Sequence, residues 1–345
     1  MNHNQMTTIC GYELVDVRRS LRDAIDQRNR RAANRWTAEL VATPGAVGSL
    51  WASYWLAWVD GAPTLPILLR QSWATVEAAA QGHGDWVAFR NDPDVRAAAA
   101  EMTTRLLNQP RPTPVVWPTK EITLYDIGVI REQTVPAAAD SRAVMSVWKR
   151  GEDDMEIRIL AGRWLTFLET GDTRSALSII SWTMMPAKVK CAARGPVLGK
   201  ARTSAIWFWL ELGRSVTSVT KHRGWPTMCA AISHAFETHW KRWTSSERMR
   251  VLLAWVLQLR TCFAGTSVEW TATPVDQRTE EIDLPYKEVA AELAGSDAGI
   301  RPPSPLQQQS KSKSKSKSES ETQSKSEAKM AAADAALAAM LGIDD

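Results

Sequence analysis

Helical periodicity is the feature that most limits what this chain can fold into. Apolar residues recur at intervals of three and four positions along most of the sequence, and no segment alternates apolar and polar residues over a convincing length. From Tyr12 onward, the first such segment carries an apolar stripe made of Val17, Leu21, Ala24 and Ile25. The pattern predicts an all-α protein built from antiparallel helical hairpins in two packed helical subdomains.

Further helices follow from the same spacing. They are expected near residues 32–40, 50–59, 65–80, 95–107, 157–168, 176–183, 201–212 and 249–263. Gly171 is suited to end one helix, and Asp172 to cap the next. A helix start is predicted at residues 153–156 and a capping box at residues 244–247, because each has an acceptor side chain three positions before a glutamate.

Composition shifts divide the chain into five predicted parts. Four prolines between residues 109 and 118 indicate an extended connector. We expect helical subdomains at residues 9–118 and 119–271, a Pro- and Gln-rich linker at 272–309, a disordered Lys/Ser/Glu linker at 310–329 and a short helix at 330–343. A weak internal repeat aligns residues 21–36 with residues 165–180, both in the form of a helix, a polar turn and a second helix.

The last predicted helix is typical of a docking peptide on a long tether. Its apolar stripe comprises Met330, Leu337, Met340 and Leu341. A helix this short is marginally stable alone, so we expect it to dock on a partner protein. Docking on the same chain and a tail without a function are the alternatives.

Composition argues against several classes of protein. No apolar run approaches 18 residues and the first residues are polar, so we expect no membrane span, no secretory signal and an intracellular location. Four scattered cysteines favour reduced thiols without a zinc site. Most of the 17 tryptophans are expected in the core, and the net charge of +4 does not by itself indicate nucleic-acid binding.

The sequence contains few patterns typical of catalytic sites. The stretch RGPVLGKAR has only three residues between Gly195 and Gly199, and Ala201 stands where a nucleotide-binding loop needs a hydroxyl. The segment from Ser146 to Lys149 fits S-x-x-K, which is too short to identify an enzyme. We therefore expect no enzyme activity, no cofactor and no metal site.

Basic residues gather in three places. The candidate nucleic-acid-binding residues come from the first two, and they are Arg18, Arg19, Arg22, Arg30, Arg31, Lys188, Lys190, Arg194, Lys200 and Arg202. The third mixes bases with aromatic residues at 221–225 and 239–243. Arginine and lysine neutralise phosphates, and tryptophan stacks on unpaired bases. Solvated helix faces with structural tryptophans are the alternative interpretation.

The N-terminal hairpin resembles a known family. Residues 11–60 are similar to the C-terminal helical region of the replication-associated recombination protein A family (MgsA type), which are clamp-loader-like ATPases. The resemblance rests on Tyr12, Leu21, Ala24, Ile25, Ala33, Trp36 and Leu40. The chain departs from the family pattern at Asp26 and Gln27, where the family has paired arginines, and again at residues 54–60.

The second half is similar to stand-alone versions of that region in large DNA viruses. The matching positions are Gly171, Asp172, Ala176, Leu177, Met184, residues 188–191, Arg194, Ile206 and Trp207. The resemblance implies a self-associating helical collar without the ATPase motor. It also implies a role in viral DNA replication, recombination or repair, located in the host nucleus, a cytoplasmic viral factory or the virion.

These observations together predict a non-enzymatic accessory factor that binds DNA through basic loops and a protein through its C-terminal helix. The alternative is a structural, self-assembling protein without DNA contact.

Overall fold

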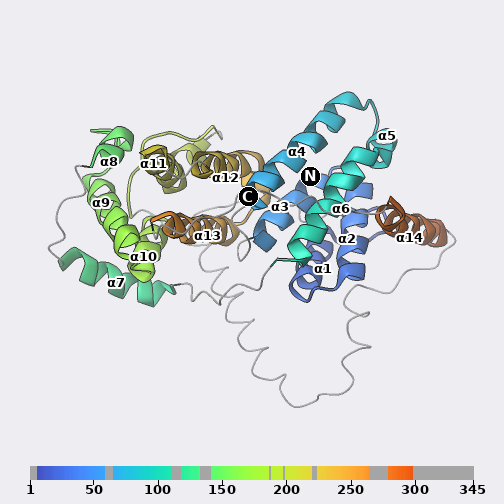
Figure 1. Cartoon of the computed structure of the whole chain (residues 1–345), viewed down its shortest axis with the longest axis horizontal. Coiled ribbons are helices and arrows are strands. Elements are labelled where there is room, and N and C mark those ends of the chain that lie inside the picture. Colours follow the sequence, from blue (N-terminus) through green and yellow to red (C-terminus); the bar gives the residue numbers. More distant parts are fainter. Residues whose placement is uncertain are drawn as a thin grey trace, which may run out of the picture. The chain divides into compact units, whose positions relative to one another are not determined.

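The computed structural model describes residues 6–58, 65–109, 118–132, 141–185, 188–196, 199–219, 224–263 and 279–297 (Figure 1). Regular structure in these ranges is helical, and β-pairing is limited to two isolated bridges. The expected all-α fold class is confirmed. The predicted docking residues, Met330, Leu337, Met340 and Leu341, lie outside the described ranges, as does the segment from 298 to 345.

The first group of helices forms the N-terminal part of the structure. It consists of α1 (Leu14–Asp26), α2 (Arg30–Ala42), α3 (Val47–Trp58), α4 (Leu65–Gly82), α5 (Trp86–Asn91) and α6 (Pro93–Leu107). Helix α2 packs on α1 and α6, and α4 packs on α6 (Figure 1). The stripe predicted for the first helix is buried, since Val17 and Leu21 are fully enclosed.

The second group follows the connector. It consists of α7 (Lys120–Glu132), α8 (Arg142–Val147), α9 (Met155–Thr170), α10 (Thr173–Thr183), the 3₁₀ turn η3 (Gly199–Thr203), α11 (Ala205–Val219), α12 (Trp225–His239), the 3₁₀ turn η4 (Trp240–Arg242) and α13 (Ser245–Phe263). Helix α10 packs on α7 and α9, while α11 packs on α8 and α12. Burial of Ile157, Leu160, Trp164 and Leu168 confirms the predicted inner face of α9.

Aromatic residues join the two groups into a shared core. Helices α12 and α13 and the turn η4 contact α3, and α12 also contacts α4. Trp243 donates its ring N–H to the carbonyl of Ala52 in α3 at 3.1 Å. The ring of Trp73 in α4 lies 5.3 Å from that of His239 in α12. The predicted use of tryptophan in the core is confirmed for the fully buried Trp51, Trp55, Trp58, Trp164, Trp209, Trp225 and Trp255.

Helix α14 (Thr279–Asp297) interrupts the linker that the sequence predicted over residues 272–309. The helix packs on α2 and α6, which belong to the first group. Pro285 lies inside it, and a proline in a helix interior removes one backbone hydrogen bond. Contacts with the body of the protein stabilise this helix, which local sequence pattern alone does not predict.

The predicted helix ends are mostly correct. Gly171 adopts a left-handed conformation (φ 79°) at the end of α9, and the Asp172 carboxylate accepts the backbone N–H of Ser175 at 3.1 Å. Thr244 and Glu247 form the reciprocal capping box, with distances of 2.9 and 3.2 Å. A different arrangement opens α9, because its N-cap residue Asp154 makes no side-chain capping bond.

No helix in the part of the chain that the structure describes has the length and hydropathy to cross a membrane.

Candidate functional site

Two aspartates before α9 fix the shape of the basic loop that joins α10 to α11. The Asp153 carboxylate accepts the backbone N–H groups of Lys149 and Ala192, each at 2.7 Å. Asp154 accepts the N–H of Lys190 at 2.5 Å and donates its own N–H to the Lys190 carbonyl at 3.0 Å. The segments 149–154 and 190–194 therefore lie side by side, although they are far apart in the sequence.

Arg194 lies beneath this loop, and its side chain is only 1% exposed. Its guanidinium pairs with both oxygens of Asp153, donates to Glu211 at 3.0 Å and donates to the carbonyl of Val147 at 2.9 Å. Burial alone would raise the pKa of Asp153, but the hydrogen bonds from Arg194 and from two backbone N–H groups outweigh burial and lower that pKa. Arg194 thus anchors the loop, and its guanidinium is not available to a ligand at the surface.

Close packing on α11 holds the other end of the loop. A side chain at Gly195 would meet the ring nitrogen of Trp207 at 2.2 Å, so only glycine fits. The Trp207 ring N–H donates to the carbonyl of Ala201 at 2.9 Å, and the ring stacks on Trp240 with centroids 5.3 Å apart. The absence of a side chain at Gly195 thus allows the loop to pack directly against the Trp207 ring.

Five cations remain exposed around the anchored segments. They are Lys149, Arg150, Lys188, Lys190 and Arg202, which we call the cationic surface. Arg202 belongs to it because its carbonyl accepts the N–H of Arg194 at 2.9 Å. Glu152 is the exposed acid within the segments 149–154 and 188–196. The side chain of Lys200, also predicted for this site, lies outside the described part of the structure.

Lys149 and Arg150 were not among the residues predicted from sequence. They belong to the turn after α8 and come close to the loop only through Asp153 and Asp154. A dibasic pair followed by two aspartates was the available signal, but the aspartates were interpreted as a helix start.

The N-terminal arginines do not form one surface. Arg18 and Arg22 point toward Glu247 at the start of α13, at 3.7 and 3.5 Å, and the Arg18 side chain is only 17% exposed. Burial lowers the pKa of Arg18, while the charge of Glu247 opposes that shift. These two arginines hold α1 against α13, so they connect the two groups of helices.

The remaining N-terminal candidates are exposed but dispersed. Arg19 is 57% exposed and lies 3.7 Å from Asp16 in its own helix. Arg31 is 88% exposed and pairs with Glu288 of α14 at 3.2 Å. Arg30 is also exposed at the start of α2. Two of these three cations thus already face a carboxylate.

The third basic and aromatic cluster is largely part of the core. His239 is 1% exposed and Trp243 is 3% exposed. Arg242 packs so closely on α3 that a side chain at Gly48 would come within 2.6 Å of its guanidinium. Lys241 is exposed, and residues 220–223 lie outside the described ranges.

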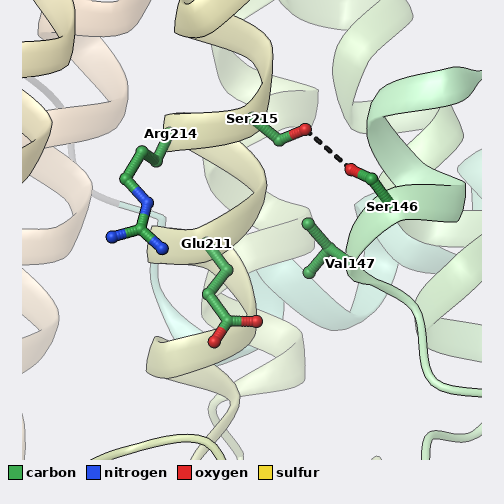
Figure 2. A pocket seen from close by; sticks show the side chains of 5 residues that line it. All are labelled: Ser146, Val147, Glu211, Arg214 and Ser215. Atoms are coloured by element: carbon green, nitrogen blue, oxygen red, sulfur yellow. Dashed lines mark hydrogen bonds between the residues drawn. The ribbon is translucent and has the colours of Figure 1, made fainter.

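A pocket of about 310 Å³ between α8 and α11 adjoins the anchor of the loop (Figure 2). It is lined by Ser146, Val147, Glu211, Arg214 and Ser215. The Ser146 hydroxyl lies 2.8 Å from the carbonyl of Ala143 and 2.8 Å from the hydroxyl of Ser215. Neither group is a general base, so these contacts do not activate Ser146 as a nucleophile.

Metal-binding residues do not converge in the described ranges, where no three His, Cys, Asp or Glu side chains are placed to hold an ion. Cys10, Cys191 and Cys229 are buried. Burial raises the pKa of the Cys191 thiol to about 12, which leaves it protonated and a poor nucleophile.

Comparison with known proteins adds no identification: no family model matches this sequence, and neither a curated protein nor a solved structure matches it. The resemblance to the replication-associated recombination protein A family stays a prediction.

Proposed function

We propose that this protein is a non-enzymatic helical accessory factor that binds DNA through the cationic surface. The observation that carries the proposal is the anchoring of two basic segments side by side by Asp153, Asp154 and Arg194. The buried ion pair fixes the backbone, and the lysines of both segments remain exposed to solvent. A fixed set of cations suits the phosphate backbone, because each contact releases condensed counterions from the DNA.

The biological setting of the proposal rests on the sequence. The resemblance suggests viral DNA replication, recombination or repair inside the host cell, with self-association of the helical region. A protein partner would bind the C-terminal helix through Met330, Leu337, Met340 and Leu341. The proposal includes no cofactor, since DNA binding of this kind needs none.

Fluorescence anisotropy of labelled single- and double-stranded DNA tests the proposal. Titrations at about 50 and 200 mM salt should show affinity that falls steeply with salt. The variants Lys188→Glu/Lys190→Glu and Lys149→Glu/Arg150→Glu should each weaken binding. For duplex DNA, each lost phosphate contact should also flatten the logarithmic salt slope by about 0.9.

A matched control separates the cationic surface from net charge. Arg70→Glu/Arg250→Glu changes the charge by the same amount at exposed positions in α4 and α13. The control should bind nearly as well as the unmodified protein. If all three double variants lose the same affinity, or if the unmodified protein binds no DNA at 50 mM salt, the proposal fails.

A second candidate function is self-assembly, and exposed apolar side chains favour it. Leu124, Tyr125 and Val129 of α7, with Met155 and Ile159 of α9, are each at least 38% exposed. The ion pair between Arg131 and Glu156 joins the end of α7 to the start of α9. Analytical ultracentrifugation of the unmodified protein and of Tyr125→Glu tests this candidate. Self-assembly requires that the unmodified protein sediments as an oligomer and that the variant sediments as a smaller species.

A further inference from the structure

Helix α14 is an acidic helix. The nineteen residues of Thr279–Asp297 include six carboxylates and one lysine. Asp283, Tyr286, Val289 and Glu292 follow one another at intervals of three, so each lies beside the next on the helix surface and the series winds part of the way round the helix. Helix α14 packs on α2 and α6, and these four residues all contact the N-terminal group. One face of α14 therefore carries the charge and the aromatic ring that meet the body of the protein.

The surface beneath α14 has the opposite charge. Arg96 of α6 donates to Asp283 at 3.1 Å, and Arg31 of α2 donates to Glu288 at 3.2 Å. Arg35 of α2 pairs with Glu292. Three arginines from two helices thus pair with three carboxylates of α14. We call this surface, with Tyr12, the arginine groove.

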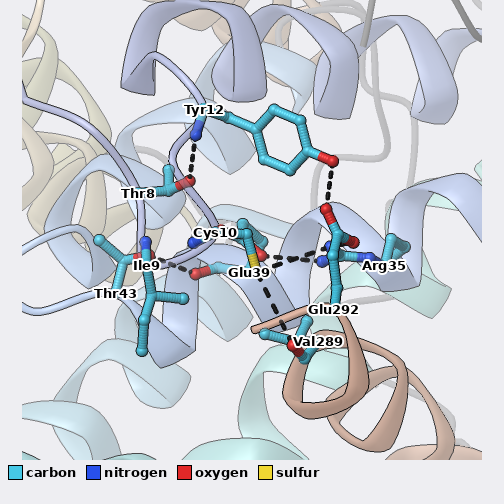
Figure 3. A network of polar contacts seen from close by, with 9 residues as sticks. All are labelled: Thr8, Ile9, Cys10, Tyr12, Arg35, Glu39, Thr43, Val289 and Glu292. Carbon is cyan, nitrogen blue, oxygen red and sulfur yellow. Dashed lines mark hydrogen bonds and ion pairs between the residues drawn. The ribbon is translucent and has the colours of Figure 1, made fainter. Parts of the chain in front are cut away.

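Hydrogen bonds to α14, which Figure 3 shows, and a cation–π contact complete the match. The hydroxyl of Tyr12 hydrogen-bonds to Glu292, and the thiol of Cys10 donates to the carbonyl of Val289 at 3.7 Å. Burial, together with the nearby Glu39 carboxylate, raises the pKa of Cys10 to about 12, so this thiol keeps its proton. The Arg96 guanidinium lies 4.4 Å from the centre of the Tyr286 ring, within cation–π range.

Internal contacts hold the groove together independently of α14. Arg35 pairs with the fully buried Glu39 at 2.9 Å, and Glu39 also accepts the N–H of Cys10 at 3.0 Å. Tyr12 packs edge-on against Trp36 with ring centroids 5.5 Å apart. These contacts lie within the N-terminal group and do not involve α14.

The attachment of α14 is weaker than its charge match suggests. Val289 is the single residue of α14 that is fully enclosed among its described side chains. Arg31 is 88% exposed and Asp283 is 40% exposed, and exposed ion pairs contribute little because water and salt screen them. Pro285 lowers the helix propensity of the segment further. Attachment through the same chain supplies a high effective concentration, which compensates for weak contacts.

We propose that the arginine groove is a binding site for an acidic amphipathic helix of a partner protein, and that α14 occupies it as an internal competitor. The partner helix would carry carboxylates where Asp283, Glu288 and Glu292 lie, and apolar or aromatic side chains where Tyr286 and Val289 lie. Such a helix displaces α14 by supplying more apolar contact along the same face. The site is separate from the cationic surface and takes a protein instead of DNA.

A labelled peptide of residues 279–297 tests the proposal with the full-length chain. The variant Asp283→Lys/Glu288→Lys places lysines opposite Arg96 and Arg31, so its own α14 is repelled from the groove. The peptide should bind this variant at least about tenfold more tightly than the unmodified protein, because apparent affinity scales with the open fraction of the groove. A peptide that itself carries Asp283→Lys should bind the variant more weakly.

The control is Ala290→Lys/Ala291→Lys, which introduces the same number of lysines at exposed positions of α14 but keeps the carboxylates that face the arginines. It should bind the peptide no better than the unmodified protein. Circular dichroism verifies that each variant remains folded. Equal peptide binding by both double variants and the unmodified protein would overturn the proposal. A double variant Asp283→Lys/Glu288→Lys that binds labelled DNA but no peptide would overturn it in favour of nucleic acid.

Discussion

Two basic stretches that look alike in the sequence have different places in the structure. In residues 18–35, Arg18 and Arg22 turn inward to Glu247, and Arg31 and Arg35 pair with α14. In residues 188–202, one arginine is buried, and Lys188 and Lys190 remain exposed. The difference teaches that a count of basic residues does not locate a phosphate-binding surface. The carboxylates that folding brings to each stretch decide which cations remain available.

Residue type contributes to this difference. A guanidinium offers five N–H groups in a planar fork and is weakly hydrated, so it suits buried pairing with a carboxylate. Arg194 uses this geometry to hold Asp153, Glu211 and the carbonyl of Val147. A lysine ammonium is strongly hydrated and stays in water. Lys188 and Lys190 follow that rule.

The largest expected effect comes from removing the buried arginine of the second stretch. Arg194→Met leaves the fully buried Asp153 carboxylate without its partner, which should lower the free energy of unfolding by about 3 to 5 kcal/mol. The same change at the exposed Arg31 should cost less than about 1 kcal/mol. Urea denaturation of both variants measures the contrast. Equal losses would contradict the distinction between the two stretches.

An intermediate effect concerns His239, a buried residue of α12 close to Arg18. Burial, with the positive charges of Arg242, His234 and Arg18, lowers the pKa of His239 well below its usual value of about 6.5. The unfolded chain therefore takes up this proton first as the pH falls. The free energy of unfolding should decrease below about pH 6.5, by up to about 1.4 kcal/mol per pH unit from this one group.

Urea denaturation at several values between about pH 5.5 and 7.5 measures this slope. His239→Gln should reduce the slope of the free energy of unfolding against pH, even if the variant is less stable at neutral pH. Arg18→Met removes one charge that repels protonated His239, so it should raise the pKa of His239 in the folded protein. The pH range over which the free energy of unfolding falls should therefore become narrower. Arg19→Met, at a side chain 57% exposed, should leave that range unchanged. A slope that persists in His239→Gln would show that another group is responsible.

The success of the helix predictions follows from local signals. Nine helices were predicted because apolar spacing and capping residues act within a few positions, as at Gly171 and Asp172. Helices α5, α7, α8, α12 and α14 were not predicted. Two of these are six residues long, and α14 contains Pro285. Helix α14 is stabilised by arginines of α2 and α6, and no local pattern reveals such contacts.

The candidate site was less predictable because its pairs are remote in sequence. Arg22 meets Glu247, 225 positions away, and Arg194 meets Asp153, 41 positions away. A sequence presents each of these arginines as one more positive charge. Only the fold shows that Asp153 removes Arg194 from solvent and brings Lys149 beside the loop.

The smallest expected effect concerns Arg28, which belongs to the first basic stretch but acts in a turn. It has a left-handed backbone (φ 55°) between α1 and α2, while Gly171 has φ 79° between α9 and α10. A non-glycine residue in this conformation costs about 1 kcal/mol. Arg28→Gly should therefore raise the free energy of unfolding by relieving this strain. The variant also loses the hydrogen bond from Arg28 Nη2 to the Gln109 carbonyl at 2.6 Å, which reduces the gain.

The reverse change at the second turn completes this comparison. Gly171→Ala should lower the free energy of unfolding by about 1 kcal/mol, since alanine pays the steric cost that glycine avoids. Arg28→Lys keeps the charge and the strained conformation, so it separates backbone strain from electrostatics. Thermal denaturation of the three variants measures the shifts. If Arg28→Gly and Arg28→Lys lower the melting temperature equally, the side chain and its bond to Gln109 outweigh the backbone strain at this turn.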